Sequence, residues 1–557
     1  MVGSDRRGEK ATMASRRDEL NAYSFARKRT NAAFLKPLPN GSIESAPRPL
    51  KAVLPSVLVG VLILVGFGAC GILKPVAPKG WDEVGKNVIV GDKSTTRYIV
   101  LNSGKGADKQ KLLHPILNLA SARLLLDPKF KVVQVKEEEL DGKLPHGPAI
   151  GIPYAPDRLP DTEEADKPKT WAVCNRPGSG EKSKTQQAVF VLGGKDKQLV
   201  EDRGKLDTDQ ALYVEDPEGK KWLVDHSGTA FEFDSTAAGN VSPPQGREKT
   251  NSDLRRIIFS GAEPQKVSAE WMATVIKSPV PIFMPRVTGA GGKTLAKGAP
   301  EKYNTIGTVL VAGDGQKYVV VQDGVELVSN FIAKLLLEGQ NAQDLHPGGG
   351  ELTAQPVATG SIDPKRDDTD RFVKFMGKVG STDMDLPWPS DTVNMANNFK
   401  EGSQTGGLVT PTENGVSCSV YTGTNTKAPG EAGKLLGYPN GVPNMQTWVG
   451  KDYPAKIASG ASSYVTPGSG LLYQQISTPE AKSGPLFLTT DTGLRYAVPR
   501  NNDSADKGGK ADDEQNKAQI HLGYEGAHPP AILKAWSELL SEGPSLDVPS
   551  AAKPQTS

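Results

Sequence analysis

The stretch AVLPSVLVGVLILVGFGACGIL, from Ala52 to Leu73, contains no charged side chain and lies between Lys51 and Lys74. As a helix, it would rise about 33 Å at 1.5 Å per residue, enough to cross a hydrocarbon core of about 30 Å. A single span in lipid must satisfy its own backbone hydrogen bonds, which favours a helix over any other form. The stretch therefore predicts one transmembrane helix that divides the chain into a short and a long part.

Charge is distributed unequally on the two sides of this segment. Residues 1–51 hold eleven basic and five acidic side chains, a net charge of +6, and the rest of the chain carries −4. Because basic residues favour the cytoplasmic side of a span, we expect residues 1–51 in the cytoplasm and the C-terminal region outside the cell membrane. A cleaved signal peptide would need a shorter leader and a shorter apolar region, so we expect an uncleaved, single-pass anchor.

Residues 17–29 have the spacing of a helix that precedes the span. Leu20, Tyr23 and Arg27 fall on one side, and acids in the first turn with bases in the last suit the helix dipole. Two interpretations stay open: a basic juxtamembrane helix attracted to anionic lipid head groups, or a helix that docks on a cytoplasmic partner. Met13 is an alternative start, which would make residues 1–12 dispensable.

Bulk composition narrows the class of protein. The chain has 557 residues, a mass of 59.2 kDa and a net charge of only +2, so bulk charge gives no reason to expect nucleic acid as a partner. It contains 60 glycines and 43 prolines, well above the usual share of these residues. This composition favours many short strands and turns over a helical bundle.

Two cysteines lie beyond the apolar segment. Cys174 and Cys418 are 244 residues apart, and an oxidising exterior favours a disulfide between them. Neither has a Cys-x-x-Cys partner or a nearby histidine, which argues against a metal site, whereas two free buried thiols stay an alternative. Cys70, inside the apolar segment, is most simply a small packing residue. The disulfide would bring two distant halves of the chain together.

A short pattern recurs four times in the C-terminal region. Each copy has a basic residue, an aromatic residue, an apolar residue and a valine, and glycine stands two places before the basic residue in the last three copies, as in a hairpin turn. The copies are TRYIV (96–100), KKWLV (220–224), QKYVV (316–320) and LRYAV (494–498). An apolar helix is expected after each, with proline in its first turn in three of the four, at 116–125, 267–272, 325–335 and 530–540.

These patterns predict an α+β fold with four hairpin-plus-helix repeat units around a strand-rich central domain stapled by the disulfide. The central domain takes both stretches that lack the pattern, each with one of the two cysteines, and residues 500–517 form a charged, solvated insertion. The expected parts are 1–51 (basic segment), 52–73 (span), 93–138, 211–285, 306–340 and 468–548 (repeat units 1 to 4), and 139–210 with 341–467 (central domain).

Five short motifs stand out beside these features: RDELNAYSF (17–25), ILKP (72–75), LHPILNLASARL (113–124), GIPYAPD (151–157) and WAVC (171–174). Together with the apolar segment, the repeats and the cysteine pair, they resemble EccB, the single-pass membrane subunit of actinobacterial type VII (ESX) secretion systems. The match runs from about Met13 to Asp547, and the charged insertion at 500–517 is a local addition.

The resemblance implies a structural subunit of an inner-membrane core complex. The expected partners are the ATPase EccC, the multispanning EccD, EccE, the mycosin protease and further copies of the chain, and the cargo is small helical proteins of the WXG100 type. The extracytoplasmic part of the family is elongated, with four related repeat domains and a disulfide-linked central domain. Members have also been credited with ATP hydrolysis.

The phosphate-binding motif that ATP hydrolysis would need is incomplete. Gly291-Gly292-Lys293-Thr294 could end a P-loop, but Val287 stands where the first glycine belongs, and no strong strand precedes it. We therefore interpret this stretch as a linker, and expect no cofactor and no catalytic residue.

Other catalytic arrangements are equally weak. Asp225-His226-Ser227 is more plausibly a turn than a triad, because neighbours in sequence rarely form one. Asp383 and Asp385 could be a carboxylate pair, but the sequence does not give their separation. None of the histidines has metal-ligand spacing: they are His114, His146, His226, His346, His521 and His528.

A structural, non-enzymatic subunit of a protein-export complex is therefore the leading hypothesis. The rival hypotheses are a membrane-anchored cell-wall hydrolase or wall-binding protein and, more weakly, an ATPase that uses Lys293.

Overall fold

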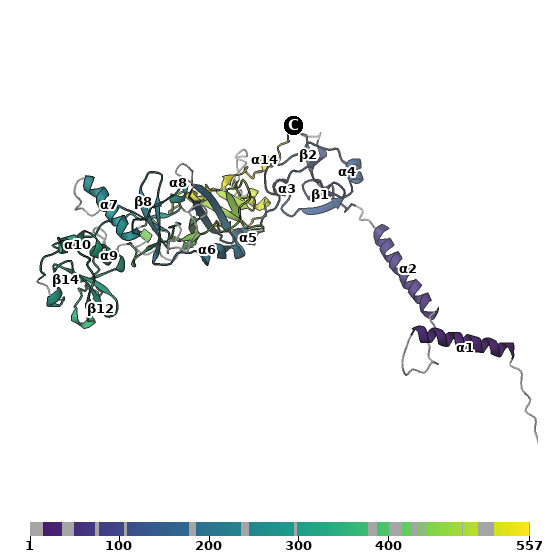
Figure 1. The fold of residues 1–557 in the computed structure, drawn as a ribbon. Coiled ribbons are helices and arrows are strands. Elements are labelled where there is room, and N and C mark those ends of the chain that lie inside the picture. The colour runs from purple at the N-terminus through teal and green to yellow at the C-terminus, as the bar shows by residue number, and fades with distance from the viewer. Residues whose placement is uncertain are drawn as a thin grey trace, which may run out of the picture. The chain divides into compact units, whose positions relative to one another are not determined.

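The fold was analysed in a computed structural model of the chain. It divides into two compact units, residues 1–79 and 80–557, which are treated separately (Figure 1). The residues described are 15–35, 50–72, 77–104, 109–177, 185–234, 244–294, 298–376, 387–399, 415–425, 433–434, 436–438, 441–481, 483–499 and 517–555. The expected alternative start at Met13 and most of the expected insertion at 500–517 lie outside these ranges.

Two helices form the N-terminal unit. The helix α1 (Arg16–Leu35) includes the expected helical residues 17–29, and α2 (Leu50–Ile72) covers the apolar segment as far as Ile72, whereas Leu73 lies outside the described residues. Judged on the part of the chain that the structure describes, no helix has both the length and the apolar character needed to cross a membrane. The expectation of a span at 52–73 is therefore not supported by the structure.

The described part of the C-terminal unit contains five β-sheets beside its helices, so the α+β class is confirmed. In the first sheet, β1 (Asn87–Gly91), β2 (Arg97–Ser103) and β3 (Gln110–Pro115) are antiparallel, and β4 (Lys131–Val135) joins β1 in parallel after α3 (Leu119–Leu125). The third sheet repeats this order with β12 (Val309–Ala312), β13 (Lys317–Val321), β14 (Gly324–Val328), α9 (Asn330–Glu338), α10 (Gln340–Leu345) and β15 (Gln355–Val357).

The second and fourth sheets extend the same order by one helix and one strand. The second has β7 (Gln210–Glu215), β8 (Lys221–Asp225), β9 (Thr229–Glu232), α7 (Pro244–Phe259), β10 (Gln265–Lys266), α8 (Ala269–Met272) and β11 (Ile276–Lys277), plus β16 (Asn394–Met395) beside β7. The fourth has β20 (Gly470–Ile476), β21 (Leu486–Thr490), β22 (Leu494–Val498), α12 (Lys517–His521), β23 (Ala531–Leu533), α13 (Lys534–Ser537) and β24 (Ser541–Glu542).

The hairpin turns follow the glycines of the repeated pattern. Gly219, Gly315 and Gly493 all have positive φ, between 76° and 85°, which glycine adopts without a steric penalty. The amide of each donates to the carbonyl three residues earlier. The fourth copy differs in position: β22 is the third strand of its meander, whereas β2, β8 and β13 are the middle strands.

The helices begin later than the sequence pattern predicted. Residues 325–328 lie in β14 and 531–533 in β23, and helices follow from Asn330 and Lys534. Hydrogen-bonding caps explain three of the starts, because the side chains of Asn118, Ser268 and Ser329 each accept from the amide three residues further on. The prolines therefore precede or end strands instead of opening the helices.

The central sheet joins the two stretches that lack the repeated pattern. Its strand order is β18-β17-β5-β6-β19, with β5 (Thr170–Arg176) and β6 (Gln186–Leu192) from the first stretch. The other strands are β17 (Val416–Asn425), β18 (Val442–Gly450) and β19 (Ser463–Val465). Because β17 pairs directly with β5, residues more than 200 positions apart in sequence form neighbouring strands.

Shared hydrophobic clusters give an order of contacts among the sheets. One cluster joins Trp171 of the central sheet to Leu212 of the second sheet and Tyr473 of the fourth. A second cluster joins the second sheet to the third, where α9 and α10 lie beside their own strands (Figure 1). A third joins Leu124 of α3 to Tyr496 of the fourth sheet. The contacts therefore run first, fourth, central, second, third.

The predicted disulfide between Cys174 and Cys418 is present. These residues are directly opposite in the β5–β17 pair, with Cα atoms 4.0 Å apart, and both are fully buried.

Replacing both cysteines by alanine should lower the free energy of unfolding by up to about 5 kcal/mol, because the bond closes a very long loop in the unfolded chain. Urea unfolding of the full chain in detergent without reductant would measure the loss. Cys70→Ser, which leaves the bond intact, serves as the control and should change little. A double variant as stable as the control would contradict a stabilising bond.

Candidate functional site

The disulfide-linked strands β5 and β17 carry polar side chains on the face opposite the disulfide. Side chains alternate between the faces of a strand, so Asn175 and Ser417, each next to a bridged cysteine and paired with one another in register, face away from the bond. Both are fully buried. They meet the second sheet, and we call this contact the second-sheet junction.

A buried amide network forms the second-sheet junction. The Gln265 Oε1 atom on β10 accepts hydrogen bonds from Ser417 Oγ at 2.8 Å and from Asn397 Nδ2 at 3.1 Å. Asn397 also bonds to both the backbone N–H and the carbonyl of Tyr213 on β7, each at 2.9 Å. Asn175 Oδ1 accepts from the amide of Ser268, the N-cap of α8. The network therefore fixes β7, β10 and α8 against the two bridged strands.

The Asp225-His226-Ser227 motif is a turn at the same junction. The Asp225 Oδ1 atom accepts hydrogen bonds from the Ser227 amide, the Ser227 hydroxyl and the Thr229 amide at 2.7–3.0 Å. Thr447 on β18 bonds to the carbonyls of Asp225 and His226. Burial raises the pKa of the Asp225 carboxyl, although these hydrogen bonds oppose the shift. Because the Ser227 hydroxyl donates to Asp225 itself, the order of a catalytic triad is absent from this motif.

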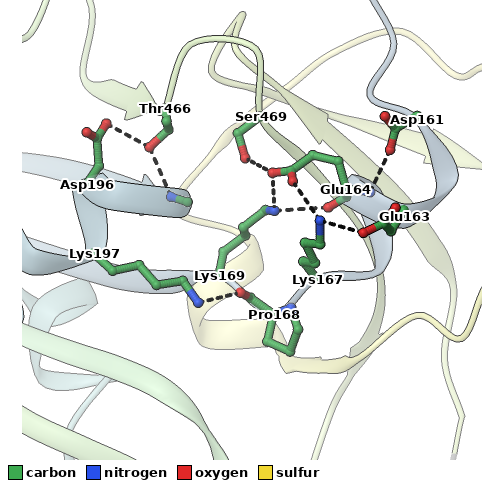
Figure 2. Close-up of polar contacts among 11 residues, drawn as sticks. Asp161, Glu163, Glu164, Lys167, Pro168, Lys169, Asp196, Lys197, Thr466 and Ser469 are labelled. Carbon is green, nitrogen blue, oxygen red and sulfur yellow. Dashed lines mark hydrogen bonds and ion pairs between the residues drawn. The ribbon is translucent and has the colours of Figure 1, made fainter.

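A buried ion pair joins the central sheet to the fourth sheet, and we call this contact the fourth-sheet junction (Figure 2). The Lys169 Nζ atom, just before β5, lies 2.6 Å from Glu164 Oε1 and 2.9 Å from the Glu164 carbonyl. Glu164 belongs to α5 (Thr162–Asp166), and its Oε1 atom also accepts from Ser469 Oγ, just before β20, at 2.7 Å. Only 2% of the Lys169 side chain is exposed.

Burial and ion pairing shift the pKa values of Glu164 and Lys169 in opposite directions. Burial opposes ionisation of Glu164, but hydrogen bonds from Lys169 and Ser469 outweigh it, so the pKa of Glu164 lies below its ordinary value. Burial dominates for Lys169 and lowers its pKa despite the nearby carboxylate. Close by, Asp196 accepts a hydrogen bond from Thr466 Oγ1, and Thr466 in turn accepts from the Gly193 amide.

The fourth-sheet junction borders a cavity of about 400 Å³. Apolar and aromatic side chains, among them Tyr421, Leu471 and Trp536, make most of its wall. Lys169 is the one cation among the lining residues that the structure describes, and Glu164 already neutralises it. The described part of the cavity wall therefore offers no unpaired positive charge for a phosphate.

The P-loop candidate is also engaged within the fold. Lys293 pairs with Thr305 in an isolated β-bridge, and its Nζ atom donates to Thr305 Oγ1 at 2.9 Å. The Thr294 hydroxyl donates to the Gln322 carbonyl, and Thr294 is buried. In a P-loop these two side chains serve the phosphates and the magnesium ion, so the local geometry differs from that of a nucleotide site.

The remaining candidate residues do not converge on a centre. The Nδ1 atoms of His114 and His521 lie at hydrogen-bond distance from the carbonyls of Pro148 and Leu126, and His146 lies 3.0 Å from Asp141. Among the residues described, no group of three or more metal-ligating side chains comes together. Asp383 and Asp385 lie outside those residues.

Sequence reasoning missed both junctions. Gln265, Asn397 and Glu164 lie in segments that carry no motif, and their partners are up to about 300 residues away. Only Ser268 could have been recognised from the sequence, because serine is a preferred residue at a helix N-cap. Their hydrogen bonds run between sheets, so the junctions can fix the orientation of one sheet against another.

Replacing Lys169 by methionine should lower the free energy of unfolding by about 2 kcal/mol, because the half-buried Glu164 keeps its charge and loses its cationic partner. The double change Lys169→Met with Glu164→Gln should recover part of this loss, since no unpaired charge remains. Urea unfolding of the four species at neutral pH gives the coupling energy. Additive losses would show that the pair has no role in joining the sheets.

Replacing Asp225 by asparagine should make the chain more stable at neutral pH and should have a smaller effect as pH approaches 4. The raised pKa of Asp225 means that the folded state holds the proton more tightly, so the wild-type chain loses stability as pH rises above the ordinary value. Asparagine keeps the acceptor oxygen without the charge. Unfolding curves between pH 4 and pH 8 measure this trend, and a gap that widens towards low pH would contradict it.

Comparison with known proteins gives the family of this chain. The family model described as "Type VII secretion system ESX-1, transport TM domain B" matches residues 12–555. The chain is 26% identical over 468 residues to the "ESX-3 secretion system ATPase EccB3" of Mycolicibacterium smegmatis, covering 81% of this chain and 76% of the relative. It is 25% identical over 533 residues to the protein of that name from Mycobacterium tuberculosis, covering 89% and 82%.

Solved structures share the fold. A chain of an intact ESX-5 inner membrane complex matches with a TM-score of 0.51 at 20% identity, covering 99% of this chain and 97% of that one. A chain of the EccB3 dimer from the ESX-3 core complex matches with a TM-score of 0.50 at 20% identity, covering 84% and 99%. With a family model that matches nearly its whole length, this chain belongs to the EccB family of type VII secretion systems.

Proposed function

We propose that this chain is a structural core subunit of a type VII secretion complex in the cell membrane and that the complex exports WXG100-type proteins. The family match over residues 12–555 carries the proposal. The two junctions add support, because they hold three sheets together with buried amides and an ion pair. Surfaces fixed in this way suit a subunit that contacts several partners at once.

We further propose that segment 52–73 anchors the chain, with the N-terminus in the cytoplasm. Its support is the run without charges and the exposure of many described aliphatic side chains on α2, including Leu62 at 62% and Leu64 at 72%. Exposed apolar surface of this extent is costly in water and favourable in lipid. The +6 charge of residues 1–51 supports a cytoplasmic location for that segment.

The extracytoplasmic region is proposed to contain four related repeat units and a central domain, in an elongated array. The recurring strand order of the four sheets and the order of contacts among them support this division. The proposed boundaries are 93–138, 211–285, 306–340 and 468–548 for the repeat units and 139–210 with 341–467 for the central domain. Not every strand lies inside the unit to which its sheet assigns it, because β1 (Asn87–Gly91) pairs in the first sheet and β15 (Gln355–Val357) pairs in the third. Proposed partners are EccC, EccD, EccE, the mycosin protease and a second copy of the chain.

Catalysis is the second question, because curated relatives carry the word ATPase in their names. We propose a non-enzymatic role for this chain. The argument is that Lys293 and Thr294, the two side chains that a P-loop needs free, are bound to Thr305 and Gln322. The cavity at the fourth-sheet junction, which is a separate place in the fold, lacks an unpaired cation among its described residues.

Purification of the tagged full chain from its membrane should test the proposal. Wild-type chain should resist alkaline carbonate extraction and co-purify with several different membrane subunits. Leu62→Asp with Leu64→Asp should release the chain from the membrane, whereas Leu62→Ile with Leu64→Ile should not. A solitary, carbonate-soluble wild-type monomer would contradict the proposed role.

The same preparations decide the catalytic question. Lys293→Ala should leave complex assembly and any ATP hydrolysis unchanged, since Lys293 is exposed and makes one side-chain hydrogen bond in the structure described. Hydrolysis by the purified full chain that disappears in this variant would establish an ATPase and overturn the non-enzymatic role.

A further inference from the structure

The helix α1 (Arg16–Leu35) exposes large apolar side chains together with basic ones. Leu20 and Tyr23 are each 72% exposed and Phe34 is 91% exposed. The spacing of positions 20, 23, 27, 30 and 34 places them along one face of the helix. Arg27 therefore stands on the same face as two aromatic rings, and we call this face the α1 stripe.

The net positive charge of α1 comes from its C-terminal half, because Arg16 and Arg17 are balanced by two acids in the first turn. Arg27, Lys28 and Arg29 are consecutive and exposed, whereas the acids of the helix, Asp18 and Glu19, are confined to its first turn. The face that combines Arg27 with the rings of Tyr23 and Phe34 complements anionic head groups above an apolar interior, and Lys28 and Arg29 add positive charge nearby. The long arginine side chain can reach the head groups while its methylene groups stay beside the rings.

We propose that the α1 stripe lies on the anionic surface of the bilayer, with its rings at head-group level and Arg27 on lipid phosphates. Lys28 and Arg29 lie about 100° and 200° further around the helix and are attracted to the same surface at longer range. This inference rests on the proposed anchoring by segment 52–73. Only residues 36–49 connect α1 to α2, so an anchored chain keeps α1 within about 50 Å of the surface and at a high local concentration.

The stripe suits a bilayer better than the groove of a protein partner. A helix that binds in an apolar groove needs a continuous series of apolar anchors. Here Arg27 and Thr30 separate Tyr23 from Phe34. A head-group layer accepts both kinds of side chain, because it provides phosphate oxygens and apolar contacts at nearly the same depth.

Site-specific labelling of the full chain in nanodiscs tests the location of the stripe. An environment-sensitive fluorophore on Thr30→Cys reports on the stripe, and the same label on Asn21→Cys, half a turn around the helix, is the matched control. Both changes are made with Cys70→Ser, since Cys174 and Cys418 are joined in a buried disulfide and do not react. Nanodiscs contain either phosphatidylcholine alone or a 7:3 mixture of phosphatidylcholine and phosphatidylglycerol.

The expected result is a blue-shifted emission from the label at position 30 in the anionic nanodiscs alone. The label at position 21 should show the emission of a water-exposed fluorophore in both kinds of nanodisc. Changing Arg27, Lys28 and Arg29 to glutamine should weaken the association of α1 with the surface about 100-fold and abolish the shift, as should 1 M salt. Equal emission from both positions in a chain that is embedded in the nanodisc would overturn this inference and leave the anchor intact.

Two further outcomes are decisive. A blue shift at position 30 that occurs only after other core subunits are added would identify a protein partner and overturn the proposed binding to the lipid surface. Failure of the chain to enter nanodiscs at all would instead contradict the proposed anchor, and the carbonate extraction described above identifies that case separately.

Discussion

The pairing of β5 with β17 is the constraint on which the rest of the C-terminal unit depends. It places Cys174 opposite Cys418. The neighbouring pair, Asn175 and Ser417, points to the other face of the strands, towards the second sheet. The residue that precedes β5, Lys169, reaches the fourth sheet through Glu164. The disulfide, the contact with the second sheet and the contact with the fourth sheet therefore all involve residues within or next to this strand pair.

Buried polar contacts give these junctions specificity that apolar packing alone lacks. The hydrophobic cluster around Trp171 would tolerate some sliding between sheets, because apolar contact is not directional. Amide and ion-pair partners are directional, and a shift that separates them leaves buried groups unsatisfied. A subunit built in this way holds its sheets in one arrangement, which an assembly of several different subunits requires.

Features that depend on a few residues were predicted well from the sequence, and extended networks of polar contacts were not. Glycine positions anticipated three hairpin turns, and two isolated cysteines anticipated a disulfide, because each depends on a few residues and simple chemistry. Helix starts were misplaced, since the apolar runs at 325–328 and 531–533 are strands and periodicity does not separate the two over so few residues. The Gln265 and Glu164 networks could not be predicted, because their partners come together only in the folded chain.

Hydrogen exchange of the full chain, with and without the disulfide, tests most directly whether the β5–β17 pair couples the second and fourth sheets. If it does, Cys174→Ala with Cys418→Ala will accelerate amide exchange at β10 and at β20 as well as in β5 and β17. Faster exchange restricted to β5 and β17, with β10 and β20 as protected as in the wild-type chain, would contradict this account.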